Sequence, residues 1–538
     1  MNRQEPITSH ASRRSATITG LDRLNLSSAS GNGRSRTFRW LVILVLILCG
    51  IVAASLYMNY VPAAGLEHSG AIITVKAGGN FQAALDRAKP GDTIELQAGA
   101  TFTGAFKLPK KAGDGFVTIR SAGADTLIPA GMRIDPAKHA SGLAKLQSNV
   151  KGEPTILAAG GAHHFRFVAV EIGPTPEGIG DIVRIGTTEE RTVEDLPHHI
   201  EFDRVYIHGS PTEGQRRGIA ANGRYIKITN SYISDIKRKG EESQAIASWA
   251  SDGPVEITNN YLEAAAENIL FGGAGSYLKL VASDCVVRDN YLNKPVEWMS
   301  QTWVVKNLFE IKNGRNIKVT NNLMTNNWAM GQDGTAILFT TRADNGPASI
   351  IEDIEFSGNI VRGAGAGINV AGDEGGGGHR LVIRNNIFED INGPKWRSTG
   401  TFMKTTNWHG LVIEGNTIIQ TGNIAVAYGK PVTNFVFRNN IVFENDYGIK
   451  GDNMGSGQEV IDKLFSNGTA SNNVIIGGRQ ALYREKNYFP VSIGQIGFRN
   501  AAEGDYGLRD QSPFAKIAVS QRPGADLNRE TVGRSVRP

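Results

Sequence analysis

The stretch Val255-Glu-Ile-Thr-Asn-Asn-Tyr-Leu262 decides the fold, because its eight-residue pattern returns along the chain. The pattern is apolar-x-apolar-x, then Asn, Asp or Gly, then Asn-x-apolar. Copies begin at Ile226, Cys285, Ile317, Ile354, Leu381, Leu411 and Phe435, and looser copies lie at Phe165, Ile200 and around Asn473. The irregular spacing, roughly 24 to 37 residues, is typical of a solenoid whose coils carry loops of different length.

Each copy reads as a short alternating strand, which cannot bury its inward face alone, so successive copies must stack. At a sharp bend, Asn tolerates a left-handed backbone, and its carboxamide can bond to the Asn of the next coil. This predicts an internal ladder through Asn260, Asn290, Asn322, Asn359, Asn386, Asn416, Asn440 and Asn473. Stacked strands with one such bend per coil predict a single-stranded right-handed parallel β-helix rather than a leucine-rich repeat or a propeller.

The N-terminal region predicts a membrane anchor. Residues 1–39 are polar and Arg-rich, and we expect a disordered cytoplasmic tail. Residues 40–60 hold an uncharged run from Trp40 to Met58, long enough for a transmembrane signal anchor, with arginines on its N-terminal side. The positive-inside rule then places the rest of the chain in the periplasm or outside the cell. The alternative is a cleaved signal peptide with Pro62-Ala-Ala64 as its cleavage site.

The remaining chain is expected to comprise a linker at 61–71, the β-helix at 72–488, and a segment at 489–538 that closes the far end and then frays. The formal net charge of the whole chain is +5. The first 39 residues hold seven arginines against Glu5 and Asp22, which is also +5. The remainder is therefore formally neutral, and no basic field for nucleic acid is expected.

A capping helix is predicted at the start of the solenoid. Residues 81–88 read as a short amphipathic helix, and Pro90-Gly-Asp92 turns the chain into a strand at 93–96. The arrangement Gln82, Ala84, Ala88, Pro90-Gly-Asp92, Ile94, Leu96, Gly99 and Gly104 resembles the opening of the pectin-lyase-like superfamily of right-handed β-helices. The resemblance covers roughly residues 72–480 and implies the fold, since that superfamily contains lyases, hydrolases, epimerases and adhesins.

Aromatic side chains indicate a glycan groove on the middle coils. Flat rings suit the apolar faces of sugars, and a neighbouring arginine suits an acidic glycan. The alternative is that these rings pack under loops as lids. The candidate substrate-binding residues are Arg217, Trp249, Trp298, Trp303, Trp328 and Trp408, with Trp396 in the same region.

The charged stretch Lys306-Asn-Leu-Phe-Glu-Ile-Lys312 is the strongest candidate for catalysis. Lys306, Glu310 and Lys312 share parity on one strand and can project outward together. Glu267 and Arg342 are expected in other coils of the same region, and stacking of the coils would bring such residues within side-chain reach. Cleavage of an acidic polysaccharide by β-elimination needs a base beside the uronate carboxylate and a cation, either Arg or Ca²⁺, that neutralises it.

This region is similar to the chondroitinase-B and alginate lyase family of β-helix enzymes, with its E-x-K, then Asn, then Leu-x-x-Arg pattern. The resemblance implies Lys312 as the base and Arg342 as its partner, and Ca²⁺ as the candidate cofactor. The chain departs from that pattern at Ala343, where the family has His, and at Val305 and Asn307, where it has paired metal-binding glutamates. The metal ligands are therefore unknown.

The leading hypothesis is a membrane-anchored lyase or epimerase that acts on a uronic-acid polymer. One alternative is a non-catalytic surface or scaffold protein that only binds glycan. Another is a glycoside hydrolase with Glu242 and Glu267 as its carboxylate pair. The motifs that mark metal-binding Cys/His clusters, serine nucleophiles and phosphate loops are not recognised in the sequence.

Overall fold

The computed structural model describes residues 70–527 and 532. The expected tail at 1–39, the anchor at 40–60 and most of the linker lie outside the described residues. Among the residues that are described, no helix is long and apolar enough to cross a membrane.

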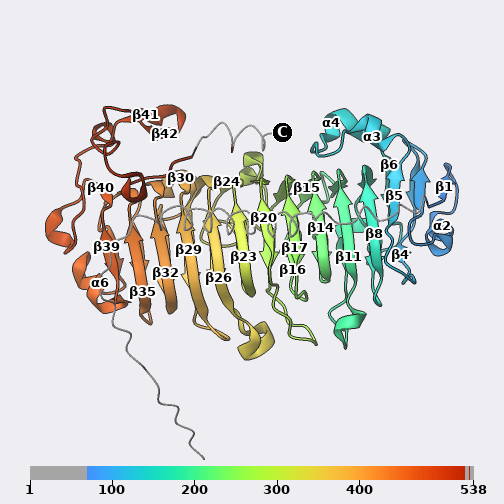
Figure 1. The fold of residues 1–538 in the computed structure, drawn as a ribbon, viewed down its shortest axis with the longest axis horizontal. Helices are drawn as coiled ribbons and strands as arrows, with labels where there is room; N and C mark the ends of the chain where they lie inside the picture. Colours follow the sequence, from blue (N-terminus) through green and yellow to red (C-terminus); the bar gives the residue numbers. More distant parts are fainter. Residues whose placement is uncertain (1–69, 528–531, 533–538) are drawn as a thin grey trace, which may run out of the picture. The chain divides into compact units, whose positions relative to one another are not determined.

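Three parallel sheets form the described unit, and each coil contributes one strand to each sheet in turn (Figure 1). Sheet A has 15 strands. They are β1 (Ile72–Val75), β2 (Thr93–Leu96), β5 (Val117–Ser121), β8 (His163–Val168), β11 (His198–Asp203), β14 (Arg224–Thr229), β17 (Val255–Thr258), β20 (Val286–Arg288), β23 (Gly314–Thr320), β26 (Ile351–Ser357), β29 (Gly378–Arg384), β32 (Trp408–Glu414), β35 (Val432–Arg438), β38 (Phe465–Ser466) and β39 (Thr469–Ser471).

Sheet B follows sheet A along each coil and has 13 strands. They are β3 (Thr101–Thr103), β6 (Ala144–Gln147), β9 (Val170–Ile172), β12 (Tyr206–His208), β15 (Tyr232–Ile236), β18 (Tyr261–Ala264), β21 (Tyr291–Asn293), β24 (Leu323–Asn327), β27 (Ile360–Ala364), β30 (Ile387–Ile391), β33 (Thr417–Gln420), β36 (Ile441–Phe443) and β40 (Val474–Ile476).

Sheet C completes each coil and has 12 strands. They are β4 (Phe106–Leu108), β7 (Ile156–Ala158), β10 (Asp181–Ile185), β13 (Arg217–Ala221), β16 (Gln244–Ser248), β19 (Glu267–Phe271), β22 (Phe309–Ile311), β25 (Thr335–Thr340), β28 (Ala366–Ala371), β31 (Met403–Thr406), β34 (Ala425–Ala427) and β37 (Ile449–Gly451). The topology is therefore that of a parallel β-helix, as the repeats predict.

The bend between sheets A and B holds the asparagine ladder. Asn260 donates both its backbone N–H (2.9 Å) and its Nδ2 (3.0 Å) to Oδ1 of Asn290, and the same pair of bonds recurs from coil to coil up to Asn487. The ladder predicted to end at Asn473 thus gains one more member. The left-handed backbone lies one position earlier, at residues such as Asn259 (φ 54°) and Asn321 (φ 56°). The left-handed backbone and the ladder hydrogen bonds, both expected of one asparagine, are therefore divided between two neighbouring residues.

The N-terminal end of the core is covered by α2 (Phe81–Arg87), as the sequence predicts. Asn80 caps this helix by accepting from the N–H of Ala83, and Phe81 packs edge-on against Phe106 at 4.8 Å. The short helices α3 (Ala124–Leu127) and α4 (Pro136–His139) lie in a loop on the outside of the coils. The end of the solenoid opposite α2 is covered by α6 (Gln458–Leu464), whose Val460 and Ile461 join the main core.

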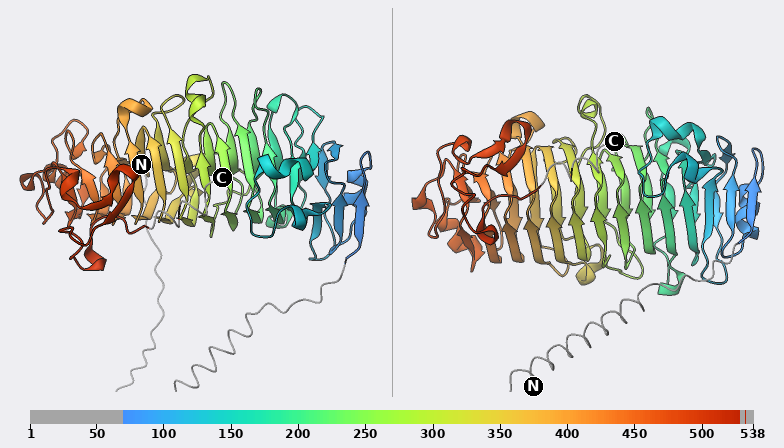
Figure 2. Two further views of the ribbon diagram at one scale, coloured as in Figure 1. Left: turned by 90° about the horizontal axis from the view of Figure 1, so that it is seen from above. Right: turned by 45° about the horizontal axis from the view of Figure 1, so that its top comes forward.

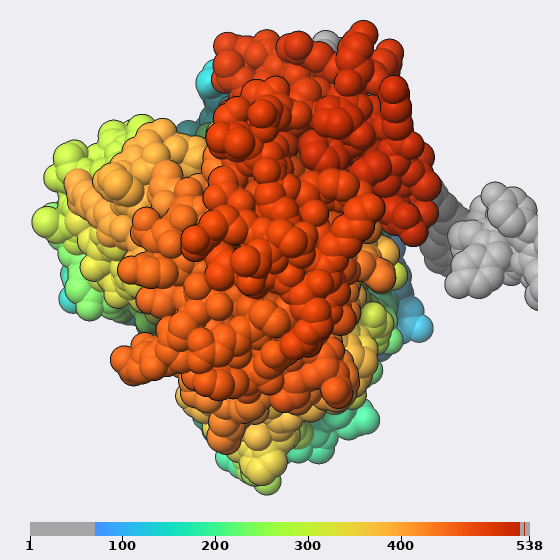
Figure 3. All heavy atoms as spheres, turned by 90° about the vertical axis from the view of Figure 1, so that its left-hand side faces the viewer, coloured from blue at the N-terminus to red at the C-terminus, as the bar shows by residue number. Residues whose placement is uncertain are grey.

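The segment after β40 folds back along the outside of the coils. It contains the antiparallel hairpin of β41 (Phe498–Asn500) and β42 (Asp505–Leu508), at the opposite end from α3 and α4 (Figure 2). Phe498 and Phe514 pack in one apolar cluster with outward residues of sheet B such as Ile387 and Ile441. Viewed from the end that holds α6, the orange-red residues of this segment cover much of the upper part of the visible surface, next to the orange residues of the last coils (Figure 3).

Candidate functional site on the outer face of sheet C

A row of polar side chains crosses the outer face of sheet C from coil to coil. The backbone register places Arg217 beside Asp181, then Gln244 beside Arg217, then Glu267 beside Gln244. Arg217 donates to Asp181 at 2.6 Å and to Gln244 at 3.0 Å, and Gln244 donates to Glu267 at 2.9 Å. All four side chains are largely buried. The row fixes the orientation of the Glu267 carboxylate, which is fully buried.

Lys306 ends this row. Its Nζ lies 3.0 Å from Oε1 of Glu267 and 2.6 Å from Oε1 of Glu242. Burial lowers the pKa of Lys306, but the two carboxylates outweigh burial, and the pKa is raised overall. Lys306 is therefore a permanent cation that holds two glutamates in place, and it is not suited to act as a base.

Glu310 is an ionisable residue between two apolar neighbours in its register column. Leu270 in the preceding coil and Leu338 in the next are its register partners, and its side chain is 1% exposed. Burial raises the pKa of Glu310 to about 7, and Glu267 adds to this effect while Lys312 opposes it. Within the part of the chain that the structure describes, Oε2 of Glu310 has no hydrogen-bond partner. A carboxyl group of this kind can exchange a proton near neutral pH.

Lys312 stands between Glu310 and the surface. Its Nζ lies 3.6 Å from Oε1 of Glu310, and its side chain is 14% exposed. Gly273, in the neighbouring coil, provides the space: a Cβ atom there would come within 3.2 Å of Cδ of Lys312 and 3.5 Å of its Nζ. Lys312 is thus the more accessible member of the Glu310–Lys312 pair, and it lies against Gly273, which lines the cleft described next.

A cleft of about 520 Å³ opens beside this cluster. Its walls come from sheet C and the loops that follow its strands, so polar backbone and side-chain groups line it. The guanidinium of Arg217 lies 4.6 Å from the centre of the Trp249 ring. Among the lining residues are Arg184, Arg216, Arg217, Glu242, Trp249 and Gly273. Arginines beside an aromatic ring suit an anionic sugar.

The sequence-predicted catalytic residues are only partly brought together. Lys306, Glu310, Lys312 and Glu267 form one cluster, as the preceding contacts show. Arg342 lies in the adjacent coil and donates its backbone N–H to the carbonyl of Lys312 at 3.3 Å. Its guanidinium instead pairs with Glu374 at 3.0 Å and is 47% exposed. The structure therefore does not place the Arg342 side chain against Lys312.

The tryptophans divide into one that lines the cleft and others that do not. Trp249 is partly exposed, whereas Trp298, Trp303 and Trp328 are buried together with Trp396 under loops. Trp408 is buried in the main core. This corrects the expectation for Trp298, Trp303, Trp328 and Trp408, because a buried ring offers no face to a sugar. The alternative interpretation, loop packing, describes Trp298, Trp303 and Trp328, whereas Trp408 belongs to the core at the start of β32.

The residues near the cluster do not fit a bound Ca²⁺. Asn307 stands where the resembled family has a glutamate. Its backbone carbonyl is one of four oxygens within 3.1 Å of Nζ of Lys294. The others belong to Ala264, Ala266 and Asn268. Such an oxygen shell suits a hard cation, but the fully buried Lys294 fills it. Glu242 and Glu267 are likewise paired with Lys306.

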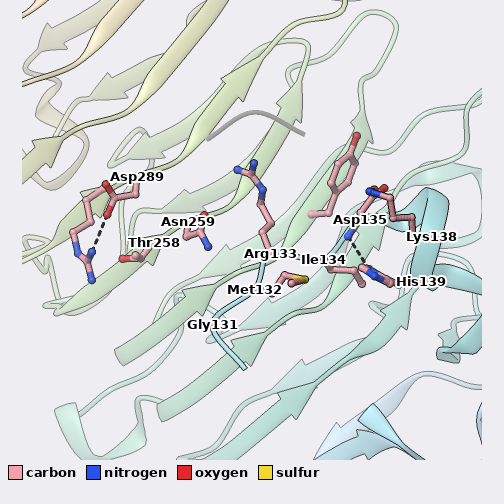
Figure 4. A pocket seen from close by; sticks show the side chains of 12 residues that line it. Gly131, Met132, Arg133, Ile134, Asp135, Lys138, His139, Thr258, Asn259 and Asp289 are labelled. Atoms are coloured by element: carbon pink, nitrogen blue, oxygen red, sulfur yellow. Dashed lines mark hydrogen bonds and ion pairs between the residues drawn. The ribbon is translucent and has the colours of Figure 1, made fainter. Parts of the chain in front are cut away.

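A larger cleft, of about 700 Å³, lies between the loop that carries α3 and α4 and the bend between sheets A and B. Figure 4 shows Arg133 between the Asp289 side of this cleft and the side formed by Asp135 and His139. Asp289 pairs with Arg288 at 2.8 Å, and the N–H of Asp135 donates to His139 at 3.0 Å. These polar groups already bond to one another. Lys138 also pairs with Asp135 at 2.7 Å, but this pair is exposed, at 75% and 34% of its side chains, unlike the buried Glu310–Lys312 pair.

Sequence reasoning missed the polar row. The sequence pattern does not predict Asp181 or Gln244 as site residues, and it suggests Glu242 only as one carboxylate of a hydrolytic pair. The available signal was a polar residue at the same position of successive coils. Reading it requires the register of sheet C, whose strands lack the asparagine signature that marks sheet A.

The topology and the cluster together define a parallel β-helix with buried ionisable groups beside a surface cleft. No protein-family model matches the chain, and no match was found among curated proteins. Among solved structures, the PL6 family alginate lyase AlyGC aligns at 15% identity with a TM-score of 0.49, over 87% of this chain and 60% of that enzyme.

Two further structures show the range of the similarity. A mannuronic acid specific polysaccharide family 6 lyase from human gut microbiota aligns at 13% identity with a TM-score of 0.43, over 78% of this chain and 83% of the other. A thermostable α-1,3-glucanase from Streptomyces thermodiastaticus aligns at 11% identity with a TM-score of 0.40, over 79% and 69%. At such values the similarities assign no activity to this chain.

Proposed function

We propose that this protein acts on an acidic polysaccharide, as a lyase or an epimerase of uronic-acid units, at the cluster on sheet C. The observation that carries the proposal is the Glu310–Lys312 pair, held beside a cleft whose walls include arginines. Burying ionisable groups costs stability, and perturbed carboxyl groups next to a cleft are typical of active sites. A lyase and an epimerase share their first step, removal of the proton beside the sugar carboxylate.

The residues take the following roles in this proposal. Arg216 and Arg184, which are partly exposed, neutralise the substrate carboxylate, so that the adjacent proton becomes acidic. Lys312 removes this proton as the neutral amine. The Glu310 carboxylate, whose Oε1 lies 3.6 Å from Nζ of Lys312, stabilises the ammonium that forms. No step is assigned to Ca²⁺.

Glycoside hydrolysis is a second candidate, supported by the same raised pKa. A carboxyl group that is protonated near neutral pH can serve as the general acid, with a second carboxylate as its partner. Glu267 and Glu242 are the carboxylates that interact electrostatically with Glu310. Hydrolysis differs from elimination in its products, so one experiment separates them.

The experiment uses the full chain with pectate, alginate and glycosaminoglycans, with EDTA or with added Ca²⁺. Absorbance near about 235 nm reports the unsaturated uronate that elimination creates, reducing ends report hydrolysis, and solvent deuterium in the recovered polymer reports epimerisation. We expect activity that Lys312→Ala and Glu310→Gln abolish and that EDTA does not change.

Lys404→Ala is the matched control, because Lys404 also projects from sheet C and pairs with Asp333 at 2.7 Å, outside the cluster. No product of any kind, with one polymer still bound, would favour the non-catalytic scaffold. Loss of activity in Lys404→Ala as well would remove the assignment to this site.

The location of the protein is also part of the proposal. An anchor at 40–60 would hold the β-helix on the outer side of the membrane, where such polymers occur. Protease added to intact cells should then digest the β-helix while the membrane retains residues 1–39. Protection of the β-helix until the cells are lysed would contradict this placement.

A further inference from the structure

Two pairs of consecutive histidines stack at the start of β8 and β11, on sheet A. His163 and His198 are neighbours in the strand register, and their rings are parallel, 4.7 Å apart. His164 and His199 stack in the same way at 4.5 Å. The second histidine of each pair has a left-handed backbone, with φ of 56° and 53°. This backbone turns both rings of each pair toward each other, which an extended strand would not allow.

The ring nitrogens of each pair also face each other. Nδ1 of His163 lies 2.8 Å from Nδ1 of His164, and the same distance separates the Nδ1 atoms of His198 and His199. Nε2 of His163 lies 2.9 Å from the carbonyl oxygen of Lys111 and must donate to it. A neutral imidazole has one N–H, so Nδ1 of His163 presents a lone pair to the interior of the cluster.

The four rings lie at the edge of the packed coils. His163 and His164 are buried, each 8% exposed, and His198 and His199 are half-buried. Imidazole binds a metal ion through a ring nitrogen that carries no proton.

We propose that His163, His164 and His198 form a site for one divalent first-row transition metal ion, such as Zn²⁺, Ni²⁺ or Cu²⁺. One ligand nitrogen from each of the three lies within 4.8 Å of the others. Metal–nitrogen bonds of about 2.1 Å place two ligands of one ion at most about 4.2 Å apart. The three atoms must therefore approach by at most about 0.6 Å, and the parallel rings of His163 and His198 must rotate so that both lone pairs point at the ion.

Binding rearranges protons without changing the charge of the rings. The hydrogen on Nδ1 of His164 moves to its Nε2, and both Nδ1 lone pairs then face the ion. His199 lies beside the three ligands, where it can complete the coordination or orient His198. Such an ion would link two adjacent coils near the N-terminal end of the solenoid. This site lies on sheet A and is independent of the function proposed for sheet C.

The test is titration of the full chain, without a polyhistidine tag, with ZnCl₂ and with CuCl₂ by isothermal calorimetry. We expect one ion per chain, and an affinity at least about tenfold lower in His163→Asn/His198→Asn. The matched control is His379→Asn/His409→Asn, because these two rings also neighbour each other but are tilted, 6.1 Å apart. The control should bind as the wild type does.

A second measurement does not depend on the variants folding. Electron paramagnetic resonance of the wild-type chain with one equivalent of Cu²⁺ should show hyperfine coupling to at least three nitrogens. Thermal unfolding should also shift upward with Zn²⁺ in the wild type and in the control, because a ligand that binds only the folded state stabilises it. Absence of binding, equal binding by the His163/His198 variant, or oxygen-dominated copper spectra would each overturn the proposal.

Discussion

Removal of one ladder carboxamide is the most direct test of how this solenoid is held together. Asn322 is fully buried at the bend between β23 and β24. Its Nδ2 donates to the carbonyl oxygens of Val287 and Thr320 and to Oδ1 of Asn359, each at 3.0 Å. Its Oδ1 accepts from the backbone N–H and from Nδ2 of Asn290, again at 3.0 Å each. Asn322→Ala removes all five bonds.

The cost follows from the groups left behind. The Asn290 backbone N–H loses its partner, and the Val287 carbonyl loses one donor, in a place that water does not reach. Each unsatisfied buried group costs about 1–3 kcal/mol. Oδ1 of Asn359 still accepts from the Asn322 backbone N–H at 2.9 Å. We therefore expect Asn322→Ala to lower the free energy of unfolding by about 3–5 kcal/mol, in the range known for a broken buried network.

Urea unfolding followed by tryptophan fluorescence measures this loss, since Trp328 is buried close by in the sequence. The control is Asn321→Gly, one residue earlier, where the side chain is exposed and φ is 56°. Glycine adopts that backbone readily, so the control should stay within about 0.5 kcal/mol of the wild type. A loss below about 1 kcal/mol in Asn322→Ala, or an equal loss in both variants, would refute the ladder as a principal source of stability.

Three further predictions concern the cluster and the cleft. The double variant Glu310→Leu/Lys312→Met should lose activity. Urea unfolding should show its stability unchanged or raised by about 1–4 kcal/mol, because apolar residues often replace a buried ion pair without loss. Strong destabilisation would show that the pair is structural. Burial raises the pKa of Glu310 in the folded chain to about 7 from 4.5, so the folded chain holds this proton more tightly than the unfolded chain does. The stability of the wild type relative to Glu310→Gln should therefore fall as pH rises from 4.5 to about 7. A stability difference that is independent of pH would contradict the raised pKa. Trp249→Ala should weaken polymer binding, measured by affinity electrophoresis, with little change in the melting temperature. Trp303→Ala should lower the melting temperature, measured by calorimetry, because that ring is buried.

The fold could be predicted because the asparagine bend repeats in every coil and is read directly from the sequence. Asn260 and its equivalents fix where sheet A ends and sheet B begins, and the apolar alternation fixes which side chains point inward. The division of roles between Asn259 and Asn260 could not be read, because both residue types tolerate a left-handed backbone. Only the hydrogen bonds show which of the two faces the core.

The site could be predicted only where its residues lie close together in the sequence. Lys306, Glu310 and Lys312 share one segment, so their parity was informative. Their partners come from other coils: Glu242 lies 64 residues from Lys306 and reaches it from a loop of no fixed length. The tryptophans did not predict the site reliably, because a large ring can either pack under a loop of the solenoid or stack against a sugar. Burial, which the sequence does not give, separates these uses.

The composition of the Glu310 column connects the fold to the proposed chemistry. The equivalent outward positions hold Ala220, Ala247 and Leu270 before Glu310 and Leu338 after it, whereas Arg184, Asn369 and Lys404 occupy the same column further away. The immediate neighbours of Glu310 are therefore apolar, and burying a carboxyl group between them costs stability. Selection for stability alone would not retain such a residue, and proteins accept local costs of this kind chiefly at functional sites. The same reasoning does not apply to Lys306, whose two carboxylate partners offset the cost of burying it. This difference supports the proposal that Glu310 and Lys312 are the reactive pair.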